Sequence, residues 1–95
     1  MLERKLRRRR MKDGGTERVV ILDGFVRQVI ALKKTKKGAV SLAKKYNSQK
    51  WRGHYWHHKV VKTDQGYAVV VIPKHIPKDR DKFNSVKFQK KYLID

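Results

Sequence analysis

Two stretches of the chain show the apolar pattern of β-hairpins. Residues 18–22 form a short β-branched run, Asp23-Gly24 follows, and residues 25–32 are again mostly apolar. Asp-Gly between two apolar runs is a strong signal for a two-residue hairpin turn. β-branched residues favour a strand over a helix for 25–32. The pattern therefore predicts a first hairpin over residues 17–32.

The second hairpin is predicted over residues 54–76. Its first strand leads into Thr63-Asp64-Gln65-Gly66, which has the length and the glycine of a common hairpin connection. Residues 67–72 return, and Pro73 stops them because proline cannot donate to a sheet ladder. The return strand is apolar at consecutive positions, so we expect it to be central and buried.

Two helices are expected beside these hairpins. Residues 39–50 place their apolar side chains at helical spacing, and Asn47-Ser48 marks the end. A second helix is predicted near the C-terminus, with Asn84 as its N-cap and Phe83 and Phe88 as a hydrophobic staple. The charged residues 77–82 before it are expected to form a loop.

The first fifteen residues differ from the rest in composition. They carry a run of cations with one acid, Glu3, and Asp13-Gly14-Gly15 then breaks the run. We expect a basic arm over 1–15 that is disordered alone and ordered on a partner; an organelle transit peptide is the alternative interpretation. Residues 16–95 are predicted to form one α+β domain, a small antiparallel sheet of two hairpins packed by two helices.

Net charge says more about the partners of this protein than the pattern of strands and helices does. The chain has 95 residues, 26 Lys and Arg against 8 Asp and Glu, a net charge of +18 and no cysteine. This length excludes a large enclosed active site, and the absence of cysteine excludes disulfides and thiolate metal sites. No apolar run approaches the roughly 20 residues that span a membrane. Such a charge needs a polyanion nearby. We expect nucleic acid and an intracellular location, in the cytoplasm or nucleoid, with an anionic membrane surface or an acidic protein as alternatives.

The cations are concentrated where acids are absent. The stretch from Gly24 to Thr63 contains no Asp or Glu, whereas an ordinary solvated face mixes both signs. Phosphates would neutralise this surface and the arm together. The predicted phosphate contacts are Arg4, Lys5, Arg7, Arg8, Arg9, Arg10, Arg27, Lys33, Lys34, Lys36, Lys37, Lys44, Lys45, Lys50, Arg52 and Lys59.

The segment Thr35-Lys36-Lys37-Gly38 precedes the first predicted helix. Free backbone N–H groups at a helix start attract phosphate, and Thr35 adds a side-chain donor there. The segment lacks the glycine pattern of a nucleotide P-loop. It is therefore either a phosphate contact or an ordinary basic loop.

Aromatic and basic residues alternate over residues 50–59. Rings interleaved with cations suit unpaired bases, which stack on flat side chains. Strand alternation places Tyr55 and His57 on one face and Trp56 with His58 on the other. We therefore predict stacking by Tyr55 and His57, and a core position for Trp56. The alternative is that both tryptophans simply fill the core.

The four histidines, His54, His57, His58 and His75, do not have a zinc-ligand spacing. We therefore expect no metal and no cofactor. The segment from Gly53 to His58, followed by a hairpin and Ile72-Pro73-Lys74-His75, resembles the core of HicA-type toxin ribonucleases. The resemblance covers about a third of the chain and departs from the family's Gly-Ser-His-His segment, because the serine is replaced. It implies an endoribonuclease with His54 or His57 as catalytic base.

A DNA-binding alternative also exists. Residues 38–48 resemble the first helix of a helix-turn-helix, but Gly53 falls where a recognition helix should follow. A winged variant with the 54–72 hairpin as wing, or an arm lying in a minor groove, remains open. On balance the sequence predicts non-catalytic nucleic-acid binding, slightly favouring RNA, beside other proteins in a nucleoprotein assembly such as a ribosome.

Overall fold

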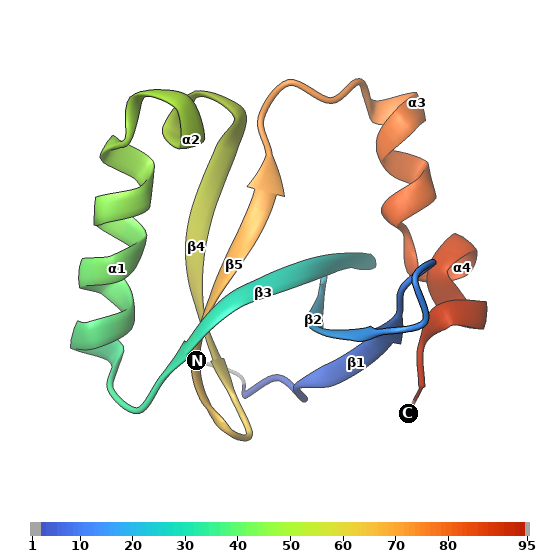
Figure 1. The fold of residues 1–95 in the computed structure, drawn as a ribbon, viewed down its shortest axis with the longest axis horizontal. Coiled ribbons are helices and arrows are strands. Elements are labelled where there is room, and N and C mark those ends of the chain that lie inside the picture. The colour runs from blue at the N-terminus through green and yellow to red at the C-terminus, as the bar shows by residue number, and fades with distance from the viewer. Residues whose placement is uncertain (1–2, 95) are drawn as a thin grey trace.

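The chain folds into a five-stranded sheet with helices at two opposite ends (Figure 1), in a computed structural model that describes residues 3–94. The sheet order is β1-β2-β3-β5-β4, and every strand pair is antiparallel. The predicted α+β class is therefore confirmed. The strands are β1 (Arg7–Arg10), β2 (Thr16–Leu22), β3 (Phe25–Lys33), β4 (Trp56–Thr63) and β5 (Gly66–Pro73). The helices are α1 (Lys36–Ser48), α2 (Lys50–Tyr55), α3 (Lys78–Asp81) and α4 (Val86–Gln89), with 3-10 turns η1 (Lys82–Asn84) and η2 (Lys90–Tyr92).

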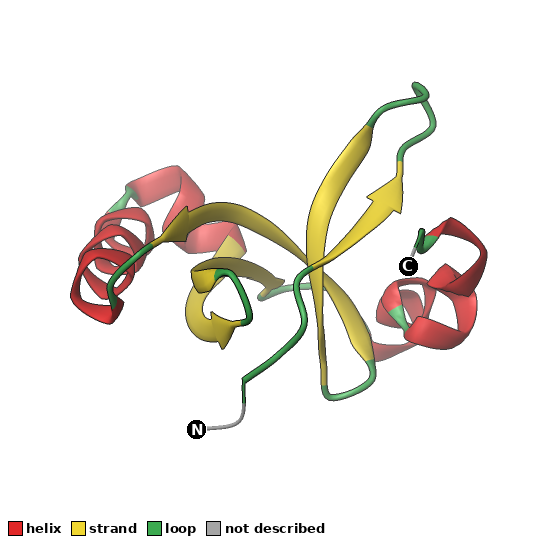
Figure 2. Cartoon of the chain, turned by 90° about the horizontal axis from the view of Figure 1, so that it is seen from below, coloured by secondary structure: helices red, strands yellow, loops and turns green. Residues whose placement is uncertain are grey.

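Strand β3 belongs to both halves of the sheet. Its first half pairs with β2 and its second half with β5, and the register shifts between Val29 and Ala31. A bulge of this kind bends a strand and increases its twist. The sheet consequently curves, and β4 and β5 run across the direction of β1 and β2 (Figure 2).

The main core lies on one face of the curved sheet. It collects Leu6, which precedes β1, and one or two apolar residues from each of β2, β3, β4 and β5: Val20, Leu22, Val29, Val61, Ala68 and Val70. Ala68 and Val70 alternate along β5 and are fully buried, as a strand with one face on this core requires. The prediction that residues 67–72 form a central buried strand is confirmed.

Helix α1 covers the other face of β3, β5 and β4. Ala39 and Ala43 contact Val69, and these small residues let the helix lie close to the sheet. Thr35 caps the helix by accepting a hydrogen bond from the backbone N–H of Gly38. The predicted helix is confirmed, and it begins three residues earlier than Ala39, at Lys36.

Both hairpin turns occur where the sequence predicts them. Asp23 and Gly24 have φ values of 53° and 85°, the two positive angles that a type I′ turn requires. Asp64 and Gln65 connect β4 to β5. A side chain on Gly66 would place its Cβ 2.7 Å from the carbonyl oxygen of Lys33, so glycine is required there.

The expectation of a disordered arm over residues 1–15 is wrong for residues 4–10. Arg7–Arg10 pair with β2 as strand β1, and Leu6 is buried in the main core. The backbone of Arg4 makes two hydrogen bonds of 2.9 Å, one to the carbonyl of Lys62 and one from the N–H of Asp64, beside the turn between β4 and β5. The side chain of Leu6 and the backbone pairing with β2 hold this basic segment against the sheet. Its charge content alone does not reveal these contacts. Residues 1 and 2 lie outside the described part of the chain.

The C-terminal region also differs in detail from the prediction. Residues 77–82 contain α3 and the start of η1 instead of a loop, and Ser85 caps α4 in place of Asn84. The amide of Asn84 donates instead to the carboxylate of Asp81. Helices of four residues are too short to produce a periodic apolar pattern. Among the described residues, no helix has the length and apolar character needed to cross a membrane.

The buried position of Leu6 makes a stability prediction. Leu6→Ala removes a side chain that is 8% exposed and leaves a cavity, so the free energy of unfolding should fall by about 2–4 kcal/mol. Lys5→Ala, at the exposed neighbouring position, should stay within about 0.5 kcal/mol of the parent chain. Urea unfolding followed by circular dichroism measures both. Equal effects of the two substitutions would show that residues 4–10 are not part of the folded domain.

Candidate nucleic-acid interface

The outer face of α1 carries exposed cations. Its inner face is held against the sheet by Ala39 and Ala43, which leaves Lys36, Lys37, Lys44 and Lys45 exposed. Lys33 and Lys34, immediately before the helix, are exposed as well. The oxygen of Thr35 already accepts the N–H of Gly38, so its first role is to cap the helix. The structure thus places these six predicted lysines on or directly before one helix.

The short helix α2 presents a series of touching rings at its surface. The rings of Trp51 and Tyr55 have centroids 5.7 Å apart, those of Tyr55 and His54 4.8 Å apart, and those of His54 and His75 5.0 Å apart. Trp51 is 69% exposed and Tyr55 47% exposed. We call these four residues the ring series. The predicted Lys50 opens the same helix and is exposed.

The register of the second hairpin brings His75 to the ring series. Trp56 pairs with Pro73, and the backbone N–H of Lys74 donates to the carbonyl of Tyr55 at 3.0 Å. One step further, His54 meets His75. The ammonium of Lys74 donates to the carbonyl of Gly53 at 2.7 Å, which places a cation beside the rings.

Gly53 allows α2 to approach the end of α1. A Cβ at this position would lie 2.1 Å from the carbonyl oxygen of Asn47, a distance no side chain tolerates. The glycine that disagrees with a helix-turn-helix therefore has a structural role. It permits the sharp change of direction between the two helices that exposes Trp51 and Tyr55.

A partly buried cluster of hydrogen bonds joins the end of α1, α2 and β4. The amide of Asn47 donates to the backbone carbonyl of His58 at 3.1 Å, and its oxygen accepts the backbone N–H of His58 at 2.8 Å. This amide thus satisfies the outward-facing backbone of β4, as a neighbouring strand would. The same oxygen lies 2.8 Å from Nδ1 of His58 and can only accept, so Nδ1 carries the proton.

Arg52 completes this cluster. Its Nε–H donates to Nε2 of His58 at 3.2 Å, and its guanidinium lies 4.9 Å from the ring centroid of Tyr46. In the neutral imidazole, Nδ1 donates to Asn47 and Nε2 accepts from Arg52, so both ring nitrogens are hydrogen-bonded. Burial lowers the pKa of His58 below its usual value, and the positive charges of Arg52, His57 and Lys74 lower it further. Arg52 therefore helps to hold α2 against α1 and β4, and its predicted phosphate contact stays a prediction.

Three other arginines predicted to contact phosphate also stabilise the fold. Arg27 is 9% exposed and makes two hydrogen bonds of 2.9 Å to Asp81, and these bonds lower the pKa of the Asp81 carboxyl. Arg9 pairs with Glu17, and Arg4 donates to the carbonyl of Ile21 at 3.1 Å. A guanidinium forms several directed hydrogen bonds at once, which suits it to such positions.

The remaining predicted residues are distributed over several surfaces. Tyr55 and His57 are both exposed, as predicted, but Tyr55 ends α2 whereas His57 lies in β4. His58 is buried but Trp56 is only half-buried, so the predicted core position of Trp56 is met only in part, and the exposed Trp51 does not fill the core. Among the other predicted cations, Arg7 is half-buried, and Lys5, Arg8, Arg10 and Lys59 are exposed.

The predicted binding residues do not include Trp51, His54, Lys74 or His75, although His54 is named as a candidate catalytic base and His75 lies in the segment that resembles the toxin ribonucleases. Hairpin register offered a signal, because counting outward from the turn places residue 54 opposite residue 75. Helix α2 gave no such signal, since six residues with a central glycine do not favour a helix.

The histidines proposed for ribonuclease chemistry lie on different elements. His54 belongs to α2 and contacts His75, whereas His57 belongs to β4. Within residues 3–94, no group of three or more His, Asp or Glu side chains gathers closely enough to hold a metal ion. Comparison with protein-family models, curated proteins and solved structures found no match for this chain.

The neutral state of His58 makes a pH prediction. Its folded pKa is lowered, so the unfolded chain takes up a proton first as pH falls below about 6.5, and stability is lost on the acid side. The urea concentration at the unfolding midpoint should therefore decrease as the pH is lowered from about 7.5 to about 5. In His58→Gln this fall should be smaller, although the variant is less stable at the higher pH.

His57→Gln is the matched control, because His57 is exposed and the other histidines are unchanged in both variants. His57→Gln removes one of the smaller causes of the lowered pKa of His58 and leaves the burial of His58 in place, so most of the fall in its midpoint with pH should remain. If His58→Gln and His57→Gln show the same pH dependence, the neutral cluster around His58 does not exist.

Proposed function

We propose that the chain binds nucleic acid, with RNA favoured over DNA, by stacking unpaired bases on Trp51 and Tyr55. Lysines of α1 and the cations beside α2 hold the phosphates. The observation that carries the proposal is the exposed ring series on α2, next to a helix whose outer face is basic.

Exposed aromatic rings support base stacking. Small proteins commonly bury their large aromatic side chains, because each of these adds a large apolar area to the core. Here the main core is built from valine, leucine and alanine, while Trp51 and Tyr55 remain at the surface. Bases stack on such rings with about 1–3 kcal/mol each.

The distribution of charge supports phosphate contacts. The net charge is +18, and the acids Glu17 and Asp81 are each engaged by an arginine of the fold. The exposed lysines of α1 have no acid in their own helix, so the mutual repulsion of these cations is relieved by a polyanion.

Single-stranded RNA fits these features better than a duplex. Stacking requires bases that are free of a partner, and RNA presents them in loops, bulges and ends. A role within a larger nucleoprotein assembly agrees with this mode of binding.

Removal of one ring tests the stacking. Trp51→Ala and Tyr55→Ala should each weaken binding to a fluorescein-labelled single-stranded RNA by about tenfold, the equivalent of about 1.4 kcal/mol. Phe83→Ala is the matched control, because Phe83 is 57% exposed and lies in η1, between α3 and α4, which are at the opposite end of the molecule from α2 (Figure 1). Fluorescence anisotropy measures all three. Equal affinities for the parent and both α2 variants would rule out the ring series as the binding site.

The salt dependence of binding tests the lysines. Each phosphate contact on a single strand adds about 0.7 to the slope of log K against log salt. Replacing Lys36, Lys37, Lys44 and Lys45 with Gln should flatten this slope by up to about 3. Replacing Lys82, Lys87, Lys90 and Lys91 with Gln removes the same charge from the opposite end. If both sets change the slope equally, the attraction is a property of the net charge and not of the α1 surface.

A further inference from the structure

A groove lies at the end of the molecule opposite α2, between residues 9–13 and residues 83–92. We call it the C-terminal groove. Its volume is about 810 Å³. Both views of the ribbon show α1 and α2 at one end and α3 and α4 at the other (Figures 1 and 2), so the C-terminal groove is separate from the ring series.

The lining of the C-terminal groove is largely apolar. Met11, Phe83, Phe88 and Tyr92 all contribute to it, and each of them is more than one-third exposed. The rings of Phe83 and Phe88 meet edge to face with centroids 5.5 Å apart. Single apolar residues are common at protein surfaces, but several large ones gathered in one groove mark a binding site.

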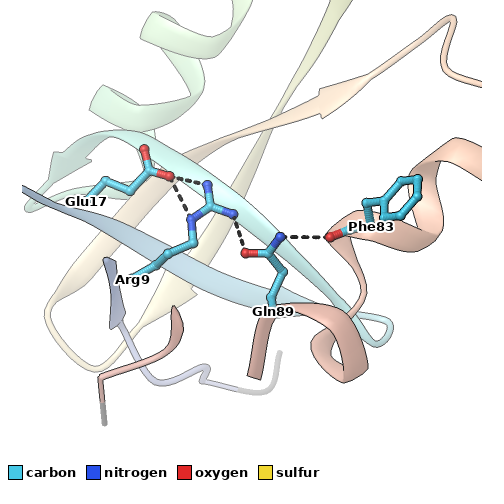
Figure 3. A network of polar contacts seen from close by, with 4 residues as sticks. All are labelled: Arg9, Glu17, Phe83 and Gln89. Atoms are coloured by element: carbon cyan, nitrogen blue, oxygen red, sulfur yellow. Dashed lines mark hydrogen bonds and ion pairs between the residues drawn. The ribbon is translucent and has the colours of Figure 1, made fainter. Parts of the chain in front are cut away.

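Two polar side chains of the lining, Arg9 and Gln89, are already hydrogen-bonded to each other. Arg9 bonds to Glu17 and donates to the amide oxygen of Gln89 at 3.2 Å (Figure 3). The amide nitrogen of Gln89 donates to the carbonyl of Phe83 at 2.7 Å. A nucleobase carries donors and acceptors on its edges and would find these groups occupied. An apolar side chain needs no such partner and loses nothing by entering.

Exposed cations surround this apolar lining. Arg10, Lys12 and Lys91 border the C-terminal groove, and the ammonium of Lys91 lies 5.2 Å from the ring centroid of Tyr92. The acid in the lining, Asp13, uses one carboxylate oxygen to accept the N–H of Gly15 at 2.9 Å. The charge at this border therefore favours an acidic ligand.

We propose that the C-terminal groove binds an acidic segment of a partner protein, which inserts an apolar side chain between Phe83, Phe88 and Tyr92. The acidic residues of the segment pair with Arg10, Lys12 and Lys91. An apolar anchor inside a charged border is the usual anatomy of a protein–protein contact. Because the C-terminal groove and the ring series lie at opposite ends, one molecule can hold RNA and this partner together.

Selection from a random displayed peptide library tests the proposal. The full chain is the immobilised target, at about 200 mM salt to suppress simple charge attraction. We expect the enriched peptides to combine Asp or Glu with Phe, Leu, Ile or Trp. Labelled copies should lose about tenfold in affinity for Phe83→Ala and for the pair Lys12→Glu with Lys91→Glu. The matched control pair Lys36→Glu with Lys37→Glu should bind them as the parent chain does.

Two results would overturn the proposal. One is enrichment of acidic peptides without apolar residues, or peptides that bind all variants equally, which is attraction by net charge. The other is displacement of the peptide by single-stranded RNA whose own affinity falls in Phe83→Ala, which makes the C-terminal groove part of the nucleic-acid surface. Amide chemical shifts of Met11, Phe88 and Tyr92 on adding the peptide locate it without any substitution. The Trp51→Ala measurement with RNA stays independent of every one of these outcomes.

Discussion

The structure depends on β3, which holds the two halves of the sheet together. This strand pairs with β2 as far as Gln28 and with β5 from Val29 onward, and its register with β5 shifts between Val29 and Ala31. The bend lets the main core gather residues from both halves, and it leaves the other face of β3 and β5 free for α1. A chain of 95 residues has few apolar side chains to divide between two separate layers. A single curved sheet brings residues from both of its halves into one main core.

Arginine and lysine have different roles in this protein. Four arginines make directed hydrogen bonds within the fold. Arg4 and Arg9 bond to β2, Arg27 links β3 to α3, and Arg52 links α2 to β4. The lysines of α1 remain exposed. A planar guanidinium satisfies several acceptors in a fixed geometry, whereas a lysine ammonium is a strongly hydrated point charge. Part of the charge of +18 therefore stabilises the fold, and the rest stays available to a polyanion.

The two ends of the molecule differ in chemistry although both are basic. At the α2 end, rings protrude and cations stand beside them, which suits flat bases and phosphates. At the other end, rings line a groove in which Arg9 and Gln89 are hydrogen-bonded to each other and exposed cations form the border. Concave apolar surface with a charged border suits a peptide side chain. The same residue types thus form two chemically different surfaces, because shape and hydrogen-bond availability differ.

The sequence by itself determined the hairpins, helix α1, the buried central strand and the basic outer surface, because these depend on local turn chemistry, periodicity and charge. Asp23-Gly24 and Pro73 act on their own neighbours. Only the tertiary structure decided that residues 4–10 join the sheet, that Arg27 and Arg52 are internal, and that Trp51 is exposed beside His54 and His75. Each of these depends on a partner distant in sequence, such as Asp81 for Arg27 or β4 for Arg4. Local propensity carries no information about such contacts, because their free energy comes from packing and pairing that exist only once the chain has folded.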